Sequence, residues 1–130
     1  QDQSGNAIAI GFQAGGFRQN DHAIAVGFEA GETDQSENAI AIGRGAGSVR
    51  QNINSIAIGR NAGTNDQSGN TIAIGYDAGN SFQKPGCIAI GQNAGATSQG
   101  NNDPSANSIA IGVQAGAGRR DQGQRDHRLR

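Results

Sequence analysis

The chain has 130 residues, of which 34% are hydrophobic and only 4% are aromatic, with no Trp and no Met. This composition excludes an ordinary globular core built around large aromatic side chains. The net charge of −1 is unevenly distributed: residues 1–118 carry five basic and nine acidic side chains, whereas residues 119–130 carry five Arg and two Asp. We therefore divide the chain into a mildly acidic body, residues 1–118, and a basic C-terminal tail, residues 119–130.

The body consists of a phrase of the form Asn-Ala-Ile-Ala-Ile-Gly-x-x-Ala-Gly that recurs with a period of 16 residues. The last interval is longer, and its extra residues lie at about 100–106. Such a period predicts a solenoid in which each repeat forms one coil and stacks on the next. The glycine that closes the Ile-Ala-Ile-Gly phrase marks each of the seven coils: Gly11, Gly27, Gly43, Gly59, Gly75, Gly91 and Gly112.

Each repeat has room for two short strands and two bends. Residues 7–10 alternate Ala and Ile, which predicts a strand with Ile on one face and Ala on the other, ended by Gly11. A second short strand is expected near Ala14, and the polar stretch around Gln19 is expected to form the second bend. Stacked coils place equivalent strands in parallel register, about 4.8 Å apart. The fold class is therefore an all-β parallel solenoid, or β-roll.

The larger side chains of the alternating strand are expected to fill the interior. On this interpretation the Ala columns, such as Ala7 and Ala9, form a smooth outer face for contact between subunits. Because two Ile per coil offset little of the ordering cost of a repeat, we expect a homo-oligomer. The predicted structural core is Ile8, Ile10, Ile24, Val26, Ile40, Ile42, Ile56, Ile58, Ile72, Ile74, Ile88, Ile90, Ile109 and Ile111.

A glutamine also recurs at every sixteenth position. Stacked amides at the strand spacing predict a hydrogen-bonded ladder that satisfies backbone groups at the bend. The alternative is a polar array that binds a repetitive ligand, and we favour the ladder. An Asn column, interrupted by His22 and Gly86, is assigned to the bend in the same way. The glutamines are Gln3, Gln19, Gln35, Gln51, Gln67, Gln83 and Gln99.

The residue after the repeated glycine varies from coil to coil. Aromatic and Arg side chains dominate this column, and both are enriched at binding surfaces. Stacking of neighbouring coils is expected to place Phe28 on Arg44 and Arg60 on Tyr76. The column is either edge packing within the roll or a binding and contact surface. Its members are Phe12, Phe28, Arg44, Arg60, Tyr76, Gln92 and Val113.

The phrase Asn-Ser-Ile-Ala-Ile-Gly, at residues 54–59 and 107–112, resembles the head repeat of YadA-like trimeric autotransporter adhesins. Residues 70–79 are similar to repeats of phage and large-virus surface or tail fibres. The resemblance covers residues 6 to about 118, although the adhesin repeat is commonly shorter than this one. It implies a left-handed parallel β-roll, a homotrimer, display on a bacterial cell or virion surface, and attachment to a host receptor or matrix molecule.

No catalytic constellation is visible, since the only histidines are His22 and His127 and no Ser-His-Asp, Cys-His or metal-binding spacing occurs. We expect no enzymatic activity, no cofactor, no metal, no nucleic-acid partner and no membrane span. Cys87 replaces a small residue of the other coils and is expected to be packed. The expected function is a structural fibre or adhesin head; the alternative is a self-assembling filament or capsid component whose open solenoid ends stack. The tail is assigned to a degenerate coil, a cap or subunit docking.

Overall fold

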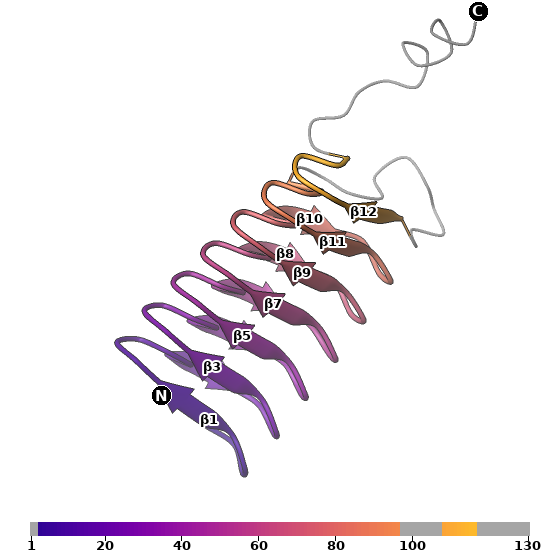
Figure 1. The fold of residues 1–130 in the computed structure, drawn as a ribbon. Coiled ribbons are helices and arrows are strands. Elements are labelled where there is room, and N and C mark those ends of the chain that lie inside the picture. Colours follow the sequence, from indigo (N-terminus) through magenta and orange to yellow (C-terminus); the bar gives the residue numbers. More distant parts are fainter. Residues whose placement is uncertain (1–2, 97–107, 117–130) are drawn as a thin grey trace, which may run out of the picture.

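The computed structural model describes residues 3–96 and 108–116. In these residues every strand pairs in parallel, and no helix occurs. The strands belong to coils of 16 residues that stack along one axis as a rod (Figure 1). The predicted all-β parallel solenoid is therefore confirmed. The insertion at about 100–106, Gln99 and the tail at 119–130 lie outside the described residues.

The Ile-Ala-Ile segments form one continuous parallel sheet, which we call the Ile sheet. Its order follows the sequence, β1-β3-β5-β7-β9-β11-β12, and each residue pairs with its equivalent in the next coil, as Ala41 does with Ala57. Its seven strands are β1 (Ile8–Ile10), β3 (Ile24–Val26), β5 (Ile40–Ile42), β7 (Ile56–Ile58), β9 (Ile72–Ile74), β11 (Ile88–Ile90) and β12 (Ile109–Ile111).

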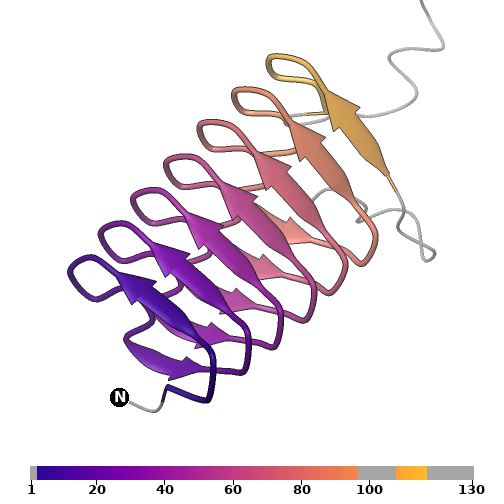
Figure 2. The same cartoon turned by 60° about the horizontal axis from the view of Figure 1, so that its bottom comes forward.

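The second strand of each coil ends on the recurring glutamine, and these strands form the Gln sheet. They are β2 (Phe17–Gln19), β4 (Thr33–Gln35), β6 (Val49–Gln51), β8 (Asn65–Gln67) and β10 (Ser81–Gln83). Figure 2 shows the two sheets along opposite sides of the rod. The expected strand near Ala14 and the bend around Gln19 are wrong, because Ala14 lies in a turn and Gln19 lies in a strand. The Gln side chain therefore comes from the sheet opposite the Ile sheet.

Each strand of the Ile sheet is followed by a β-turn, and β3 to β11 also begin after one. At the start of β3 the Ala23 backbone nitrogen donates to the Asn20 oxygen at 3.2 Å, and at its end the Ala30 nitrogen donates to the Gly27 oxygen at 3.4 Å. The third residue of each β-turn has a positive φ, 62° at His22 for example, as type II turns require. Asn tolerates this conformation better than most residues. The Asn column consequently occupies the third position of the strand-start β-turns, with φ of 61°, 60°, 59° and 60° at Asn6, Asn38, Asn54 and Asn70.

The repeated glycine after the Ile pair is required by both conformation and space. Gly43 has a φ of 126°, and a Cβ at this position would lie 2.7 Å from the backbone oxygen of Gly59 in the next coil. Only glycine adopts this φ readily, and only glycine lacks the Cβ that would meet the next coil. The column of glycines that follows the Ile strands therefore allows the coils to stack in direct contact. The chain therefore reverses at the end of each Ile strand without interrupting the stack.

The interior of the rod contains Ala and Gln, and the Ile side chains face outward. Ala25, Ala41, Ala57 and Ala73 have no exposed surface, whereas Ile10 on the neighbouring position of the same sheet is 60% exposed. The glutamine of the opposite sheet occupies the remaining interior space, and Gln19, Gln35, Gln51 and Gln67 are fully buried. Small side chains account for most of the other buried positions, which include Ser55, Thr71 and Cys87.

The predicted face assignment is therefore wrong in both parts. The Ala columns are the core, not a subunit contact, and the Ile columns are half-buried or exposed outer residues, not the core. The half-buried members owe their cover to their neighbours one coil away in the same column. The correction applies to every residue assigned to the core: Ile8, Ile10, Ile24, Val26, Ile40, Ile42, Ile56, Ile58, Ile72, Ile74, Ile88, Ile90, Ile109 and Ile111.

Candidate functional site: the outer face of the Ile sheet

The amide ladder inside the rod fixes the geometry of the Ile sheet. Gln35 Nε2 donates to the backbone oxygen of Ile24 at 2.7 Å and lies 3.2 Å from both the Ala39 backbone oxygen and the Gln51 Oε1. One side chain thus joins the opposite sheet, the strand-start β-turn and the next coil. The predicted ladder is present from Gln3 to Gln83.

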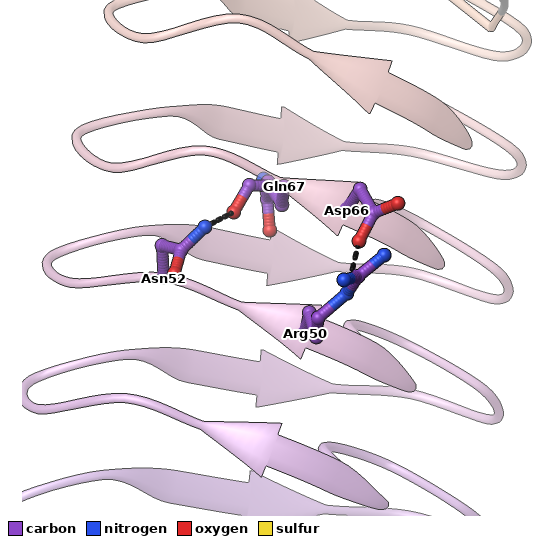
Figure 3. Close-up of polar contacts among 4 residues, drawn as sticks. All are labelled: Arg50, Asn52, Asp66 and Gln67. Atoms are coloured by element: carbon purple, nitrogen blue, oxygen red, sulfur yellow. Dashed lines mark hydrogen bonds and ion pairs between the residues drawn. The ribbon is translucent and has the colours of Figure 1, made fainter.

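The ladder has one gap, between Gln51 and Gln67. The Gln67 Oε1 is buried without a hydrogen-bond partner, whereas Gln51 Nε2 donates to the backbone oxygens of Ile40 and Ser55. Gln67 is still held on its far side, because its Nε2 donates to Gln83 Oε1 at 3.1 Å. The same two coils are nevertheless joined by Asn52, whose Nδ2 donates to the Gln67 backbone oxygen at 3.1 Å (Figure 3).

The outer face of the Ile sheet carries two parallel columns of β-branched side chains, which we call the Ile face. It extends over seven strands, or about 30 Å along the rod at the usual strand spacing. Ile8 is 46% exposed, Ile42 is 38% exposed and Ile111 is 64% exposed. Soluble monomers rarely leave a contiguous apolar surface of this kind uncovered. The Ile face is therefore the candidate contact surface of this rod.

The variable column borders the Ile face, because its members are the second residues of the strand-end β-turns. The expected stacking between coils is confirmed: the Arg44 guanidinium lies 5.7 Å from the ring centre of Phe28, and that of Arg60 lies 5.4 Å from the ring centre of Tyr76. Phe12 also stacks on Phe28, with 5.3 Å between ring centres. These contacts hold both guanidinium groups in place while leaving the two Arg residues exposed.

The opposite border of the Ile face is formed by the second residues of the strand-start β-turns. Asp21 and Glu37 are exposed there in consecutive coils, and Ile53 is 51% exposed in the next coil. These residues are not among those predicted as a site from the sequence, although they occupy one column at the 16-residue spacing. Their significance depends on the Ile face pointing outward, because only then do the two turn columns border an exposed surface.

The outer face of the Gln sheet has a different character. Its middle column alternates in charge from Arg18 to Asp66, and Arg18 pairs with Asp34 at 2.5 Å between Nε and Oδ1. Arg50 pairs with Asp66 at the same distance (Figure 3). A parallel stack places equivalent residues next to one another, so identical charges in this column would repel. The alternation satisfies these charges within one chain. This face consequently has less need of a partner than the Ile face.

The remaining candidate residues are structural. His22 occupies the third position of a strand-start β-turn, with a φ of 62°. Cys87 is fully buried, as expected, and its Sγ lies 3.2 Å from Ser108 Oγ. Among residues 3–96 and 108–116, no group of three or more His, Cys, Asp or Glu side chains could hold a metal ion. The same residues contain no helix long and apolar enough to cross a membrane.

Comparison of the chain with protein-family models, with curated proteins and with solved structures finds no match. The functional proposal therefore rests on the fold and on the Ile face with its two borders.

Proposed function

We propose that this chain is a non-enzymatic structural rod that works as a homo-oligomer held together by its Ile face. The observation that carries the proposal is the distribution of side chains: methyl groups and amides fill the interior, and the largest aliphatic side chains cover one outer face. Burial of apolar surface is the main favourable contribution to folding and association. A chain that places its Ile residues outside gains this contribution only when another molecule covers them.

A second copy is the partner that fits the Ile face best. The face is flat, repeats every coil and extends along the described part of the rod, so an identical face matches it in shape and in spacing. The resemblance to trimeric adhesin heads and virus fibres supports three chains and a bacterial or virion surface. Attachment to a host receptor or matrix molecule is the use that this resemblance supports. In such an assembly the outer face of the Gln sheet stays accessible.

A matched pair of substitutions tests the proposal. Ile42 on the Ile face and Val49 on β6 of the Gln sheet are 38% and 36% exposed, so a lysine at either position has similar access to water in a single chain. We expect Ile42→Lys to weaken self-association at least about tenfold, because a charge would enter an apolar interface. Val49→Lys should leave it unchanged. Both variants are compared by sedimentation equilibrium, with circular dichroism as the check on folding.

The proposal is contradicted if both folded variants keep the molecular mass of the wild type. A greater effect of Val49→Lys would place the subunit contact on the Gln sheet.

A further inference from the structure

Two of the four Arg residues in the described part of the chain have no carboxylate partner within it. Arg18 and Arg50 on the Gln sheet each pair with an Asp of the next coil, whereas Arg44 and Arg60 in the variable column, which we call the Arg pair, make no ion pair there. The Arg pair is exposed and occupies equivalent positions of consecutive coils, about 4.8 Å apart at the usual strand spacing. Like charges in such positions repel. The rod thus carries an uncompensated positive pair beside the Ile face.

Aromatic rings hold the Arg pair from both sides. The Arg44 guanidinium lies over the ring of Phe28 in the preceding coil, and the Arg60 guanidinium lies over the ring of Tyr76 in the following coil. The order along the column is therefore ring, guanidinium, guanidinium, ring. A ring contacts the flat face of a guanidinium and leaves the N–H groups at its edge free to donate. The two guanidinium groups are consequently preorganised, with donors left for an external acceptor.

The adjacent turn residues do not neutralise the Arg pair. The third residue of the strand-end β-turn is Gly45 in one of the two Arg coils and Asn61 in the other, whereas the coils on either side carry Glu29 and Asp77 there, both half-buried. The Asn61 side chain reaches toward the preceding coil, where its Oδ1 would lie 2.9 Å from a Cβ at Gly45. The Arg coils thus present two guanidinium groups and one neighbouring amide, without a carboxylate in the third turn position.

The charge of the rest of the rod limits the kind of anion that fits. A carboxylate suits the planar N–H fork of Arg, and its two oxygens can each accept from one member of the Arg pair. Residues 1–118 carry nine acidic and five basic side chains, so a densely charged polyanion meets repulsion beyond these two coils. The ligand that fits best carries isolated carboxylates.

The border also favours a saccharide over a peptide. A peptide that adds to a sheet needs a row of free backbone donors and acceptors. Here the oxygens of Phe28, Arg44 and Arg60 accept from turn nitrogens of the following coil at 2.8, 2.9 and 3.0 Å, so recognition depends on side chains. Tyr76 and Gln92 follow the Arg pair in the same column and are exposed. Phenol hydroxyl groups, amides and aromatic rings suit the hydroxyl groups and C–H surfaces of sugars.

We propose that the Arg pair binds a carboxylate of an acidic saccharide, with Asn61, Tyr76 and Gln92 as neighbouring contacts for the sugar hydroxyl groups. This inference rests on the proposed function for its use, since it names the ligand class of the proposed attachment, but the binding itself needs only one copy of the chain. An assembly of several chains presents one Arg pair from each copy. Simultaneous binding to one polysaccharide then raises the overall affinity.

Binding of the full chain to immobilised hyaluronan, which carries a carboxylate on alternate sugars, tests the proposal. The wild type should bind hyaluronan and not neutral dextran, and the binding should weaken as salt is added. Arg44→Ala with Arg60→Ala should weaken binding by about tenfold or more, because two charge-assisted contacts are lost. Arg44→Lys with Arg60→Lys keeps the charge without the planar fork and should restore only part of the binding.

A matched control removes the same charge from the other sheet. Arg18→Ala with Arg50→Ala should leave hyaluronan binding within about twofold of the wild type, because these side chains lie outside the variable column. Biolayer interferometry gives the affinities, circular dichroism verifies folding, and sedimentation equilibrium verifies that each variant keeps the wild-type molecular mass.

Several outcomes would overturn the inference. These are a wild type that does not bind hyaluronan, equal losses in the two Ala variants, and Arg-dependent binding of dextran sulfate without binding of hyaluronan. Equal affinity for poly-glutamate would assign the Arg pair to an acidic peptide, and a lower molecular mass of the Arg44→Ala, Arg60→Ala variant would assign it to a subunit contact. A monomeric wild type that binds hyaluronan through the Arg pair would contradict the proposed self-association and support this inference.

Discussion

At the scale of single residues, the buried glutamines define the interior. The Gln19 Nε2 group faces the Ile8 oxygen of the opposite sheet, the Ala23 oxygen of the adjacent β-turn and the Gln35 Oε1 of the next coil, and its Oε1 accepts from Gln3 Nε2. An aliphatic side chain in this position would make none of these hydrogen bonds. The recurring Gln is therefore as necessary to the fold as the repeated Gly.

Removal of one glutamine should be costly. We expect Gln35→Ala to destabilise the protein by about 2–4 kcal/mol, because it deletes three contacts of a fully buried amide and removes one of the acceptors of Gln19 Nε2. Gln92→Ala, at an exposed position of the variable column, is the control and should have little effect. Thermal unfolding of both variants at one protein concentration provides the comparison. Equal midpoints for the two variants would show that the ladder contributes nothing to stability.

At the scale of the strand and the coil, the sequence predicts the positions of the strands better than the direction in which their side chains point. The period places all strands of the Ile sheet, the parallel register and the amide ladder, because each depends only on spacing. The alternation of Ala and Ile shows that Ile8 and Ile10 lie on the same face of their strand. It does not show whether this face points into the rod or away from it. That choice depends on Gln19, which lies in a strand opposite the Ile sheet and fills the interior. The second strand was misplaced, since Phe17–Gln19 shows no apolar alternation and its middle residue has a positive φ.

The alternating charges of the Gln sheet lead to a prediction at this scale. Asp34→Arg should destabilise the coil stack at low salt, because it removes the Arg18 pair and places three Arg in neighbouring coils at 18, 34 and 50. The loss of stability should be smaller at high salt, because salt screens the repulsion between the Arg side chains. Asp34→Asn, which removes the pair without adding repulsion, should lose less. Thermal unfolding at two salt concentrations measures both effects, and a loss independent of salt would rule out the electrostatic explanation.

At the scale of the whole molecule, the rod keeps its Gln amides and its Ala side chains inside and its Ile residues outside. Hydrogen bonds and close contact hold the interior together, and in the proposed assembly the Ile face supplies the apolar contact. The Ile face and its two borders were not predictable as a site from the sequence, because the outward direction of the Ile columns had to be known first. The stacking of Phe28, Arg44, Arg60 and Tyr76 was predictable, since it follows from the period.

The molecular mass of the folded wild-type chain in solution tests the central claim most directly. Native mass spectrometry or sedimentation equilibrium at micromolar concentration, on protein shown by circular dichroism to be β-structured, should give an integral multiple of the 13.2 kDa chain mass, with three chains expected. A stable folded monomer of 13.2 kDa, with the Ile face open to water, would contradict the account.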